Sequence, residues 1–310
     1  VLDRFILGTP KRISREAPVI ILRHEEQQDI PGGGANALAN LAALGVQVSV
    51  IAAVGDDEPG RALTAALDDR GVDTSRIETV PGYSTPTKVR ILGGGPSSLK
   101  HQVARYDIED TLPEEGDWKT SVLNHLREES SRCGALAISD YGYGCVRPGA
   151  LQHLAQSKSG TPWLCLESRY RIGRFVGVHG ATPNLEELEA HCGRRLRFDS
   201  AVATAADELR EELGARFVLA TRGNHGMTLV EKDHDPHHIP VFGSDQVADV
   251  TGAGDTVLAV LTAALAAAAE PVEAAHLANI AAGLVVMKLG TATISAAELR
   301  TAITSSEKFE

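Results

Sequence analysis

Short apolar segments alternate with helical patterns along most of this 310-residue chain, and this alternation most constrains the fold. Residues 46–54 (VQVSVIAAV) predict a buried strand, and residues 58–70 predict a helix that ends at Gly71. Parallel strands need such crossover connections, which are almost always right-handed. The sequence therefore predicts a three-layer α/β fold with a mainly parallel central sheet flanked by helices. The same pattern predicts strands at residues 135–139, 162–166 and 216–221 and a helix at residues 148–158.

Two regions interrupt this alternation and predict a small β-sheet that protrudes from the main domain. Residues 18–22 and 85–106 have the pattern of hairpin strands, with a turn at residues 93–96. Such a sheet over a ligand cleft can act as a lid, which we assign to segments about 8–31 and 80–108. Its apolar face needs cover, so we expect a homodimer formed through the lids.

Composition excludes several functional classes. Apolar residues make up 43% and charged residues 23% of the chain, as in ordinary globular proteins, and the length fits one domain over residues 1–310. With 41 acidic residues against 30 Lys and Arg, the net charge of -11 argues against a nucleic-acid partner. The apolar run at residues 257–269 predicts a buried helix too short to span a bilayer, so we expect no membrane partner. Four cysteines without a CxxC pair predict reduced thiols and a cytoplasmic location, and the first residue, Val1, predicts that a short segment precedes it.

The sequence Asp-Val-Thr-Gly-Ala-Gly-Asp at residues 249–255 carries the strongest chemical signal. Gly252 and Gly254 allow the backbone to pass close to a ligand, and the apolar helix pattern that follows brings free N–H groups and a positive dipole end. Such a helix end binds anions. Asp255 beside it is suited to take the proton from a hydroxyl that attacks a phosphate, which indicates phosphoryl transfer to an alcohol. The alternative is that Thr251 or Asp255 only caps the helix and the glycines shape a turn.

Three more motifs indicate ligand contacts, each with a structural alternative. The sequence PGGGAN at residues 31–36 allows close approach, and its Asn amide can bond sugar hydroxyls, or it is only a capped turn. In TPNLEE at residues 182–187, Asn184 and Glu187 share one helix face, where a carboxylate can hold water on Mg²⁺ or form a capping box. The sequence TRGNHGM at residues 221–227 follows a strand and suits a polyphosphate, or forms an ordinary β-turn with an exposed Arg.

Taken in order, the four motifs resemble those of the ribokinase-like carbohydrate kinases: a glycine-rich sugar loop with Asn, an NxxE motif, a TRG turn and a GAGD loop. Within that group the chain is most similar to the D-glycero-D-manno-heptose 7-phosphate kinases of lipopolysaccharide-precursor synthesis. The segments that carry this likeness are residues 2–5 (LDRF), 13–19 (ISREAPV), 87–90 (TKVR), 139–141 (SDY) and 288–293 (KLGTAT). The resemblance implies ATP-dependent phosphorylation of a sugar or sugar phosphate, with Mg²⁺ and, as in some relatives, K⁺ as cofactors.

The resemblance also implies a role for each matching residue. Asp255 is the general base, and the N–H groups of Gly252, Ala253 and Gly254 form the anion hole. The sugar side is expected to contain Asp3, Gly33, Asn36, Lys88 and Arg105. The nucleotide side is expected to contain Asn184, Thr221, Arg222, Gly223, Gly226 and Asn279. Glu187 is expected to act on Mg²⁺ through water, and Asp249 either helps to hold a monovalent cation or forms a loop hydrogen bond.

Three departures from the heptose kinases concern the sugar side. They are Glu167 where those enzymes usually have Asp, Tyr143 where they often carry Lys, and a longer lid hairpin at residues 93–100. A 7-phosphate also needs cationic partners, and each candidate is alternatively a surface charge: Arg15, Lys88, Arg90, Lys100 and Arg169. Kinases of ribose, fructose or another sugar phosphate, and a non-catalytic sugar- or nucleotide-binding regulator, therefore stay open, since fold does not determine substrate. A dinucleotide-binding enzyme is disfavoured because no GxGxxG follows the first strand pattern.

Overall fold

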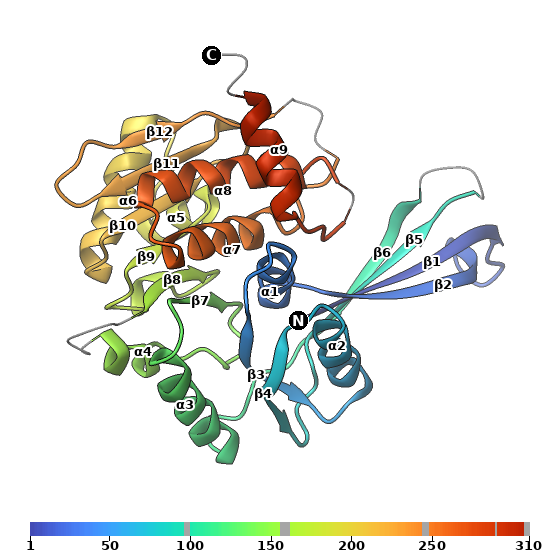
Figure 1. Ribbon diagram of the computed structural model, residues 1–310. Helices are drawn as coiled ribbons and strands as arrows, with labels where there is room; N and C mark the ends of the chain where they lie inside the picture. The colour runs from blue at the N-terminus through green and yellow to red at the C-terminus, as the bar shows by residue number, and fades with distance from the viewer. Residues whose placement is uncertain (96–99, 156–161, 244–247, 289, 307–310) are drawn as a thin grey trace.

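The computed structural model describes residues 1–95, 100–155, 162–243, 248–288 and 290–306, which form an α/β body and a projecting β-sheet (Figure 1). The strands are β1 (Leu2–Ile13), β2 (Ile20–Pro31), β3 (Ser49–Gly55), β4 (Asp73–Val80), β5 (Thr87–Gly93), β6 (His101–Ile108), β7 (Ala135–Asp140), β8 (Trp163–Ser168), β9 (Gly180–Ala181), β10 (Phe217–Thr221), β11 (Met227–Glu231) and β12 (His237–Ile239). The α-helices are α1 (Gly34–Ala43), α2 (Glu58–Asp68), α3 (Asp117–Ser130), α4 (Pro148–Ala155), α5 (Leu185–Cys192), α6 (Asp199–Leu213), α7 (Ala253–Ala266), α8 (Pro271–Val285) and α9 (Ala296–Ser306). Two short 3₁₀ turns are η1 (Ile172–Arg174) and η2 (Gly223–His225).

A six-stranded sheet forms the centre of the body, in the order β12-β11-β10-β9-β8-β7. The four strands from β7 to β10 pair in parallel, whereas β11 and β12 are antiparallel. The carboxyl ends of the parallel strands therefore meet at one edge, where open sheets of this kind bind their ligands. The predicted mainly parallel central sheet is confirmed.

Alternate side chains of the central sheet pack in two separate apolar cores, one on each face. In β10, Phe217 and Leu219 pack in a cluster with α7 and α8, whereas Val218 and Ala220 pack in a cluster with α5 and α6. This division follows from the two-residue period of a strand, whose side chains point to opposite faces in turn. Helices therefore cover both faces of the sheet, which confirms the three predicted layers.

The projecting sheet, which we call the lid, has the order β2-β1-β5-β6 (Figure 1). β1 pairs antiparallel with β2 and parallel with β5, and β5 pairs antiparallel with β6. The prediction started this sheet near residue 8, but β1 already begins at the fully buried Leu2. The charged residues Asp3 and Arg4 interrupt the apolar pattern from which a strand is predicted. Their partners, Arg90 and Asp29, are distant in sequence, so the pairing that allows these charges in a strand could not be inferred locally.

β3 and β4 form a separate parallel pair packed between α2 and α3. β3 is the strand predicted at residues 46–54, although it starts three residues later, at Ser49. The strands predicted at residues 135–139, 162–166 and 216–221 and the helix predicted at 58–70 match β7, β8, β10 and α2 within two residues. The strand predicted at residues 18–22 extends much further, to Pro31, and the helix predicted at 257–269 starts earlier, at Ala253, and ends at Ala266. The end of the helix predicted at residues 148–158 and the last residue of the turn at 93–96 lie outside the described residues.

The structure also bears on the cysteines and on the apolar run near the C-terminus. All four cysteines are free thiols: Cys133, Cys145, Cys165 and Cys192. The apolar run forms α7, which is buried along most of its length. Among the described residues, no helix combines the length and apolar character needed to cross a membrane.

Candidate active site

The N-terminus of α7 is the point where the motifs meet. Gly252 precedes the helix with a φ of 81°, and a Cβ at this position would stand 2.4 Å from Nδ2 of Asn36. Only glycine suits both the left-handed backbone and this close approach. The helix then presents its first N–H groups at this end, although that of Ala253 already donates to the carbonyl of Val250 at 3.3 Å.

Asp255 is buried in the first turn of α7, with 4% of its surface exposed. Its two carboxylate oxygens accept hydrogen bonds from different parts of the fold. Nδ2 of Asn36, on α1, donates to Oδ2 at 3.1 Å, and the hydroxyl of Tyr141, after β7, donates to Oδ1 at 3.1 Å. The structure therefore brings together two of the predicted motifs, with Asp255 at their junction.

The surroundings of Asp255 suit a proton acceptor. Burial raises the pKa of its carboxyl group to about 7, because the charged form loses its hydration. The hydrogen bonds from Asn36 and Tyr141 act in the opposite direction, while the negative charge of Asp3 raises the pKa and the positive charge of Lys88 lowers it. A carboxyl group with a pKa near neutrality can both accept and release a proton at physiological pH.

Glu167, near the end of β8, is a second carboxylate beside the same helix end. Its Oε1 lies 3.0 Å from the place that a Cβ of Gly254 would take, so glycine leaves room for it. Its Oε2 is buried without a hydrogen-bond partner among the described residues. Burial, and then the charge of Asp255, raise the pKa of Glu167 well above its usual value, against the opposing charge of Arg169. Two buried carboxylates repel each other, so the pair favours holding one proton.

In the glycine-rich loop at residues 31–36, the side-chain amide of Asn36 bonds within the protein. Nδ2 of Asn36 also lies 3.4 Å from the carbonyl oxygen of Gly252. Nδ2 of Asn40 donates to the carbonyl oxygen of Asn36 at 3.0 Å and to its Oδ1 at 3.3 Å. Both the nitrogen and the oxygen of the Asn36 amide therefore have partners within the protein. In the same loop, Gly33 faces Tyr141, since a Cβ added to Gly33 would lie 3.2 Å from two carbons of the Tyr141 ring.

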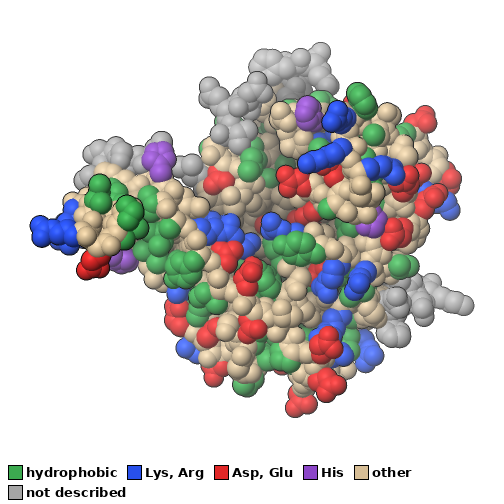
Figure 2. All heavy atoms as spheres, turned by 180° about the vertical axis from the view of Figure 1, so that it is seen from behind, with side chains coloured by type: hydrophobic (Ala, Val, Ile, Leu, Met, Phe, Trp, Pro, Cys, Tyr) green, Lys and Arg blue, Asp and Glu red, His purple; other side chains and the backbone are tan. Residues whose placement is uncertain are grey.

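Cationic side chains gather where the lid meets the body, as Figure 2 shows on one face. Arg90 forms an ion pair of 2.7 Å with the buried Asp3, and Nζ of Lys88 lies 5.3 Å from the ring centre of Tyr141. Burial lowers the pKa of Lys88, the charge of Asp3 opposes this, and the charges of Arg169, Arg105 and Arg90 add to it, so each of these groups lies within electrostatic range of Lys88. Two other candidates lie elsewhere in the lid: Lys100 pairs with Glu25, and Arg15 is exposed between β1 and β2.

Two of the segments predicted to contact a nucleotide, those with Asn184 and Thr221, lie at the ends of β9 and β10. Asn184 caps α5, and the capping box that the sequence allowed is present: Glu187 N–H donates to Oδ1 of Asn184 at 2.9 Å, and Asn184 N–H donates to Glu187 Oε2 at 3.0 Å. The Thr221 N–H bonds the carbonyl of Pro183, which brings this turn beside the NxxE motif. Burial raises the pKa of Glu187, although the hydrogen bond from the backbone N–H of Asn184 acts to lower it.

Other predicted nucleotide contacts have partners within the protein. Arg222 forms an ion pair with Asp199 and donates to Thr228 at 3.2 Å. Gly223 and Gly226 shape the turn after β10, both with positive φ. Nδ2 of Asn279, on α8, donates to the carbonyl of Pro240 at 2.8 Å.

Asp249 forms loop hydrogen bonds in this structure. Its Oδ1 accepts from the N–H of Thr251 at 2.9 Å, and its Oδ2 accepts from the N–H of Gly290 at 3.1 Å. These bonds tie the segment before α7 to the segment after α8. The described residues contain no group of three or more His, Cys, Asp or Glu side chains arranged to hold a metal ion.

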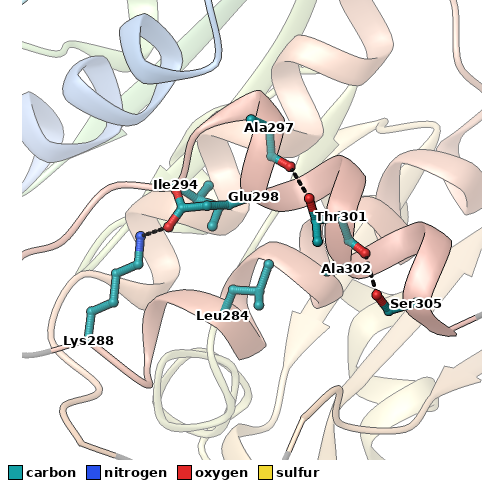
Figure 3. A pocket seen from close by; sticks show the side chains of 8 residues that line it. All are labelled: Leu284, Lys288, Ile294, Ala297, Glu298, Thr301, Ala302 and Ser305. Carbon is teal, nitrogen blue, oxygen red and sulfur yellow. Dashed lines mark hydrogen bonds and ion pairs between the residues drawn. The ribbon is translucent and has the colours of Figure 1, made fainter.

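Two surface hollows differ in their relation to this site. One, of about 450 Å³, is lined by Tyr141, Tyr143, Tyr170 and the polar segment 109–111. It adjoins Asp255, because Tyr141 bonds that residue. The other, of about 400 Å³, lies between α8 and α9, where Lys288 pairs with Glu298 (Figure 3). The second hollow contains none of the predicted site residues.

Sequence reasoning did not assign a role to Tyr141, Asn40 or Asp140. Tyr141 and Asp140 occur where β7 ends, at the edge of the sheet that binds ligands, and that position was the available signal. Their partners could not be inferred, because Asp255 lies 114 residues from Tyr141 along the chain.

Comparisons with known proteins agree with this arrangement. The chain matches the pfkB family of carbohydrate kinases over residues 5–116 and 169–298. It is 40% identical over 306 residues to "Bifunctional protein HldE" of Hahella chejuensis, covering 98% of this chain and 61% of that protein. The protein of the same name from Pseudomonas syringae pv. tomato is 38% identical, with coverage of 100% and 63%. The chain thus spans about three fifths of the length of these curated relatives.

Solved structures share the fold. Phosphofructokinase-2 from Escherichia coli in complex with potassium superposes with a TM-score of 0.77 at 20% identity, covering 99% of this chain and 96% of that chain. Arabidopsis thaliana ribokinase complexed with ribose and ATP gives a TM-score of 0.70 at 18% identity, with coverage of 97% and 95%. The fold is ribokinase-like, and the matched sequence spans most of its length. This chain belongs to the pfkB family of carbohydrate kinases.

Proposed function

We propose that this chain transfers the γ-phosphoryl group of ATP to the anomeric hydroxyl of D-glycero-D-manno-heptose 7-phosphate, forming the 1,7-bisphosphate. The observation that carries the proposal is the buried Asp255 carboxylate at the glycine-rich N-terminus of α7. Family membership supports the sugar-kinase reaction, and the resemblance to heptose 7-phosphate kinases supports the substrate.

Proton transfer and phosphate stabilisation are separate tasks in this reaction. Asp255 takes the proton of the sugar hydroxyl as that oxygen bonds to the γ-phosphorus, and the bond to the β-phosphate oxygen breaks to release ADP. The N–H groups of Gly252, Ala253 and Gly254 stabilise the charge on the transferring group, because fixed donors in a dry site need no reorganisation. The carboxyl pKa near 7 keeps Asp255 available as a base at neutral pH.

The nucleotide is expected along the turn after β10, between Thr221, Arg222, Gly223 and Gly226, with its base near Asn279. The half-buried carboxylate of Glu187 and the amide oxygen of Asn184, the residue that bridges Thr221, are oxygen donors of the kind that Mg²⁺ prefers, and both now take part in the capping box. When bound, Mg²⁺ offsets negative charge on the phosphates. Asp249 is our candidate for a K⁺ site, for which its loop hydrogen bonds would have to rearrange or be shared.

The sugar phosphate is expected between the lid and the body. Lys88, Arg105 and Arg169 provide positive charge there for the 7-phosphate, while Arg90 is held by Asp3. Gly33, Asn36 and Asp3 border the reacting end of the sugar. Tyr143 bonds Glu109 at 2.8 Å in the adjoining hollow, so it presents a neutral group where the heptose kinases often carry Lys.

A screen of acceptors tests the proposal. Purified protein, Mg-ATP and a panel of sugars and sugar phosphates are followed by coupled release of ADP. We expect the highest kcat/KM with D-glycero-D-manno-heptose 7-phosphate. A higher value with ribose or fructose 6-phosphate would overturn the substrate, and measurable ATP binding with no turnover of any acceptor would favour the regulatory alternative.

We also propose that two copies associate through their lids. Every residue of β6 is exposed, and apolar side chains on the lid that face solvent include Ile13, Ile20, Val103 and Ile108. Burying such a surface against a second copy removes apolar area from water. Sedimentation equilibrium measures the mass directly, and a monomer at micromolar concentration contradicts this proposal.

A further inference from the structure

Tyr141 links the base to three other parts of the site, and none of the roles above accounts for it. Its hydroxyl donates to Oδ1 of Asp255 at 3.1 Å. We propose that Tyr141 is a positioning residue, whose phenol aims the Asp255 carboxylate at the acceptor hydroxyl and favours its ionised form. This inference rests on the proposed function in one respect, that Asp255 is the base.

The turn that carries Tyr141 is anchored by the residue before it. Oδ1 of Asp140 accepts from the N–H of Gly142 at 3.1 Å and pairs with Arg171, and Oδ2 accepts from Oγ of Ser168 at 2.7 Å. Asp140 is 3% exposed, so these bonds form where water screens them little. They join the ends of β7 and β8 and thereby hold Tyr141 at the edge of the sheet.

The ring of Tyr141 is confined by the sugar loop and by the lid. A Cβ at Gly33 would stand 3.2 Å from two ring carbons, so a side chain there would press on the ring and shift it by a few tenths of an ångström. On another side, Nζ of Lys88 lies 5.3 Å from the ring centre, within the range of a cation–π contact. The phenol therefore has little freedom to leave Asp255.

The two donors to Asp255 act on different oxygens, which restricts rotation of the carboxylate. Asn36 donates to Oδ2 at 3.1 Å, opposite the phenol. Its amide is oriented by Asn40, which donates to Oδ1 of Asn36 at 3.3 Å and in turn accepts the N–H of Ile294 at 3.2 Å. The remaining lone pairs of the carboxylate are left for the acceptor hydroxyl.

Several charged groups face Asp255 from neighbouring elements. They are Asp3 on β1, Lys88 on β5 and Glu167 on β8. Burial, and then the charges of Asp255 and Glu167, raise the pKa of Tyr141 well above its usual value, so the phenol stays protonated and continues to donate. Because that donation stabilises the charged form of Asp255, its loss must raise the pKa of the base.

The test compares the wild-type protein with Tyr141→Phe, which removes only the hydroxyl. Two quantities are measured: the pH dependence of kcat with saturating acceptor, and the carboxyl titration of Asp255 by ¹³C NMR without substrate. We expect both midpoints to move up by about one pH unit, because a hydrogen bond that favours the charged form is lost and water recovers only part of its effect. KM for the sugar should change less than kcat at neutral pH.

Tyr83→Phe is the matched control, since it removes a phenol that is buried in a separate cluster with Leu112 and Trp118, and its kcat midpoint should stay where the wild type has it. Unchanged ATP affinity shows that each variant is folded. A uniform loss of kcat in Tyr141→Phe with an unmoved midpoint, or an unmoved NMR titration, overturns the proposal. If the wild-type protein phosphorylates no acceptor, the proposed function fails, and the NMR titration still decides whether the phenol supports the ionised carboxylate.

Discussion

The base site and the lid differ in how firmly the protein holds their charged groups. Asp255 is 4% exposed and bonded at both oxygens by two other elements. In the lid, every residue of β6 is exposed, and the side chain of Arg105 is 40% exposed with a bidentate bond to Asp107, two residues away. Asp255 is held out of water by long-range contacts, whereas β6, the edge strand of the lid, holds the charge of Arg105 near the surface by a local contact.

From this difference we infer that the two regions have different tasks, turnover at Asp255 and substrate binding at the lid. Electrostatic interactions strengthen as water is excluded, so small changes beside Asp255 act strongly on the reacting groups. Exposed ion pairs are screened and contribute little to stability, so lid charges can change without loss of the fold. We therefore expect substitutions at the base site to act on kcat and substitutions in the lid to act on KM.

The largest effect should follow Asp255→Asn. Removing the proton acceptor should lower kcat by about 10²–10⁴-fold, the usual contribution of a positioned base. ATP affinity, measured by calorimetry, should stay nearly unchanged because the amide keeps the shape of the side chain. A variant with near-normal kcat would end the role assigned to Asp255 and, with it, the contrast between the two regions.

A pH profile should show the next largest effect. The buried Asp255 carboxyl group has a pKa raised to about 7, and only its ionised form accepts the proton. The kcat should therefore fall as pH drops through 7, by about tenfold per unit and about 100-fold at pH 5. Steady-state rates at saturating substrates measure this, and a flat profile from pH 5 to 8 contradicts it.

Arg105→Gln tests the lid and should have a smaller effect. Losing a charged contact to the 7-phosphate should raise KM for the sugar phosphate roughly tenfold, less than a fully buried contact would, because water screens this side chain. The kcat should change little. Lys11→Gln, at an exposed lysine of β1, is the control that should leave KM unchanged. Equal effects of Arg105→Gln on kcat and KM would contradict the expectation that lid substitutions act on KM and not on kcat.

Glu167→Gln should show the smallest effect, on stability. Burial raises the pKa of Glu167 above its unfolded value, so the stability it contributes is present below about pH 4.5 and is lost as pH rises through the folded pKa. The Gln variant has no such charge, so at pH 8 its melting temperature should exceed that of the wild type by roughly 2 °C and converge with it at low pH. Thermal unfolding measured across this range checks the sign. A variant that is less stable than the wild type at pH 8 shows that the ionised carboxylate has a partner.

The fold was predictable to the extent that local patterns encode it. The apolar runs that became β7, β8 and β10, and the glycines before α7, identified their elements within one or two residues. The start of β1 was not predictable, because Asp3 and Arg4 interrupt the apolar pattern and are satisfied only by Arg90 and Asp29. Strand membership there depends on pairing across the chain, which local composition does not reveal.

The site was predictable in its residue types and less so in its pairings. Asp255 and Asn36 were both candidates, but the sequence assigned Asn36 to the sugar, whereas its amide bonds Asp255. Asn184 and Glu187 form the capping box that the sequence offered as an alternative, and Asp249 forms the loop bonds that were its alternative. Local spacing allowed both readings in each case, since a capping group and a ligand contact need the same side chains.

The sequence by itself determined the layered α/β plan and the glycine-rich start of α7, because strand period, helix period and glycine conformation are local properties. Only the tertiary structure decided which donors hold Asp255, that Oε2 of Glu167 has no hydrogen-bond partner among the described residues, and which cations act on Lys88. The two donors to Asp255, Asn36 and Tyr141, lie 219 and 114 positions from it along the chain. The topology of the sheet and the order of its strands bring them together, and the burial that follows sets the pKa of the base.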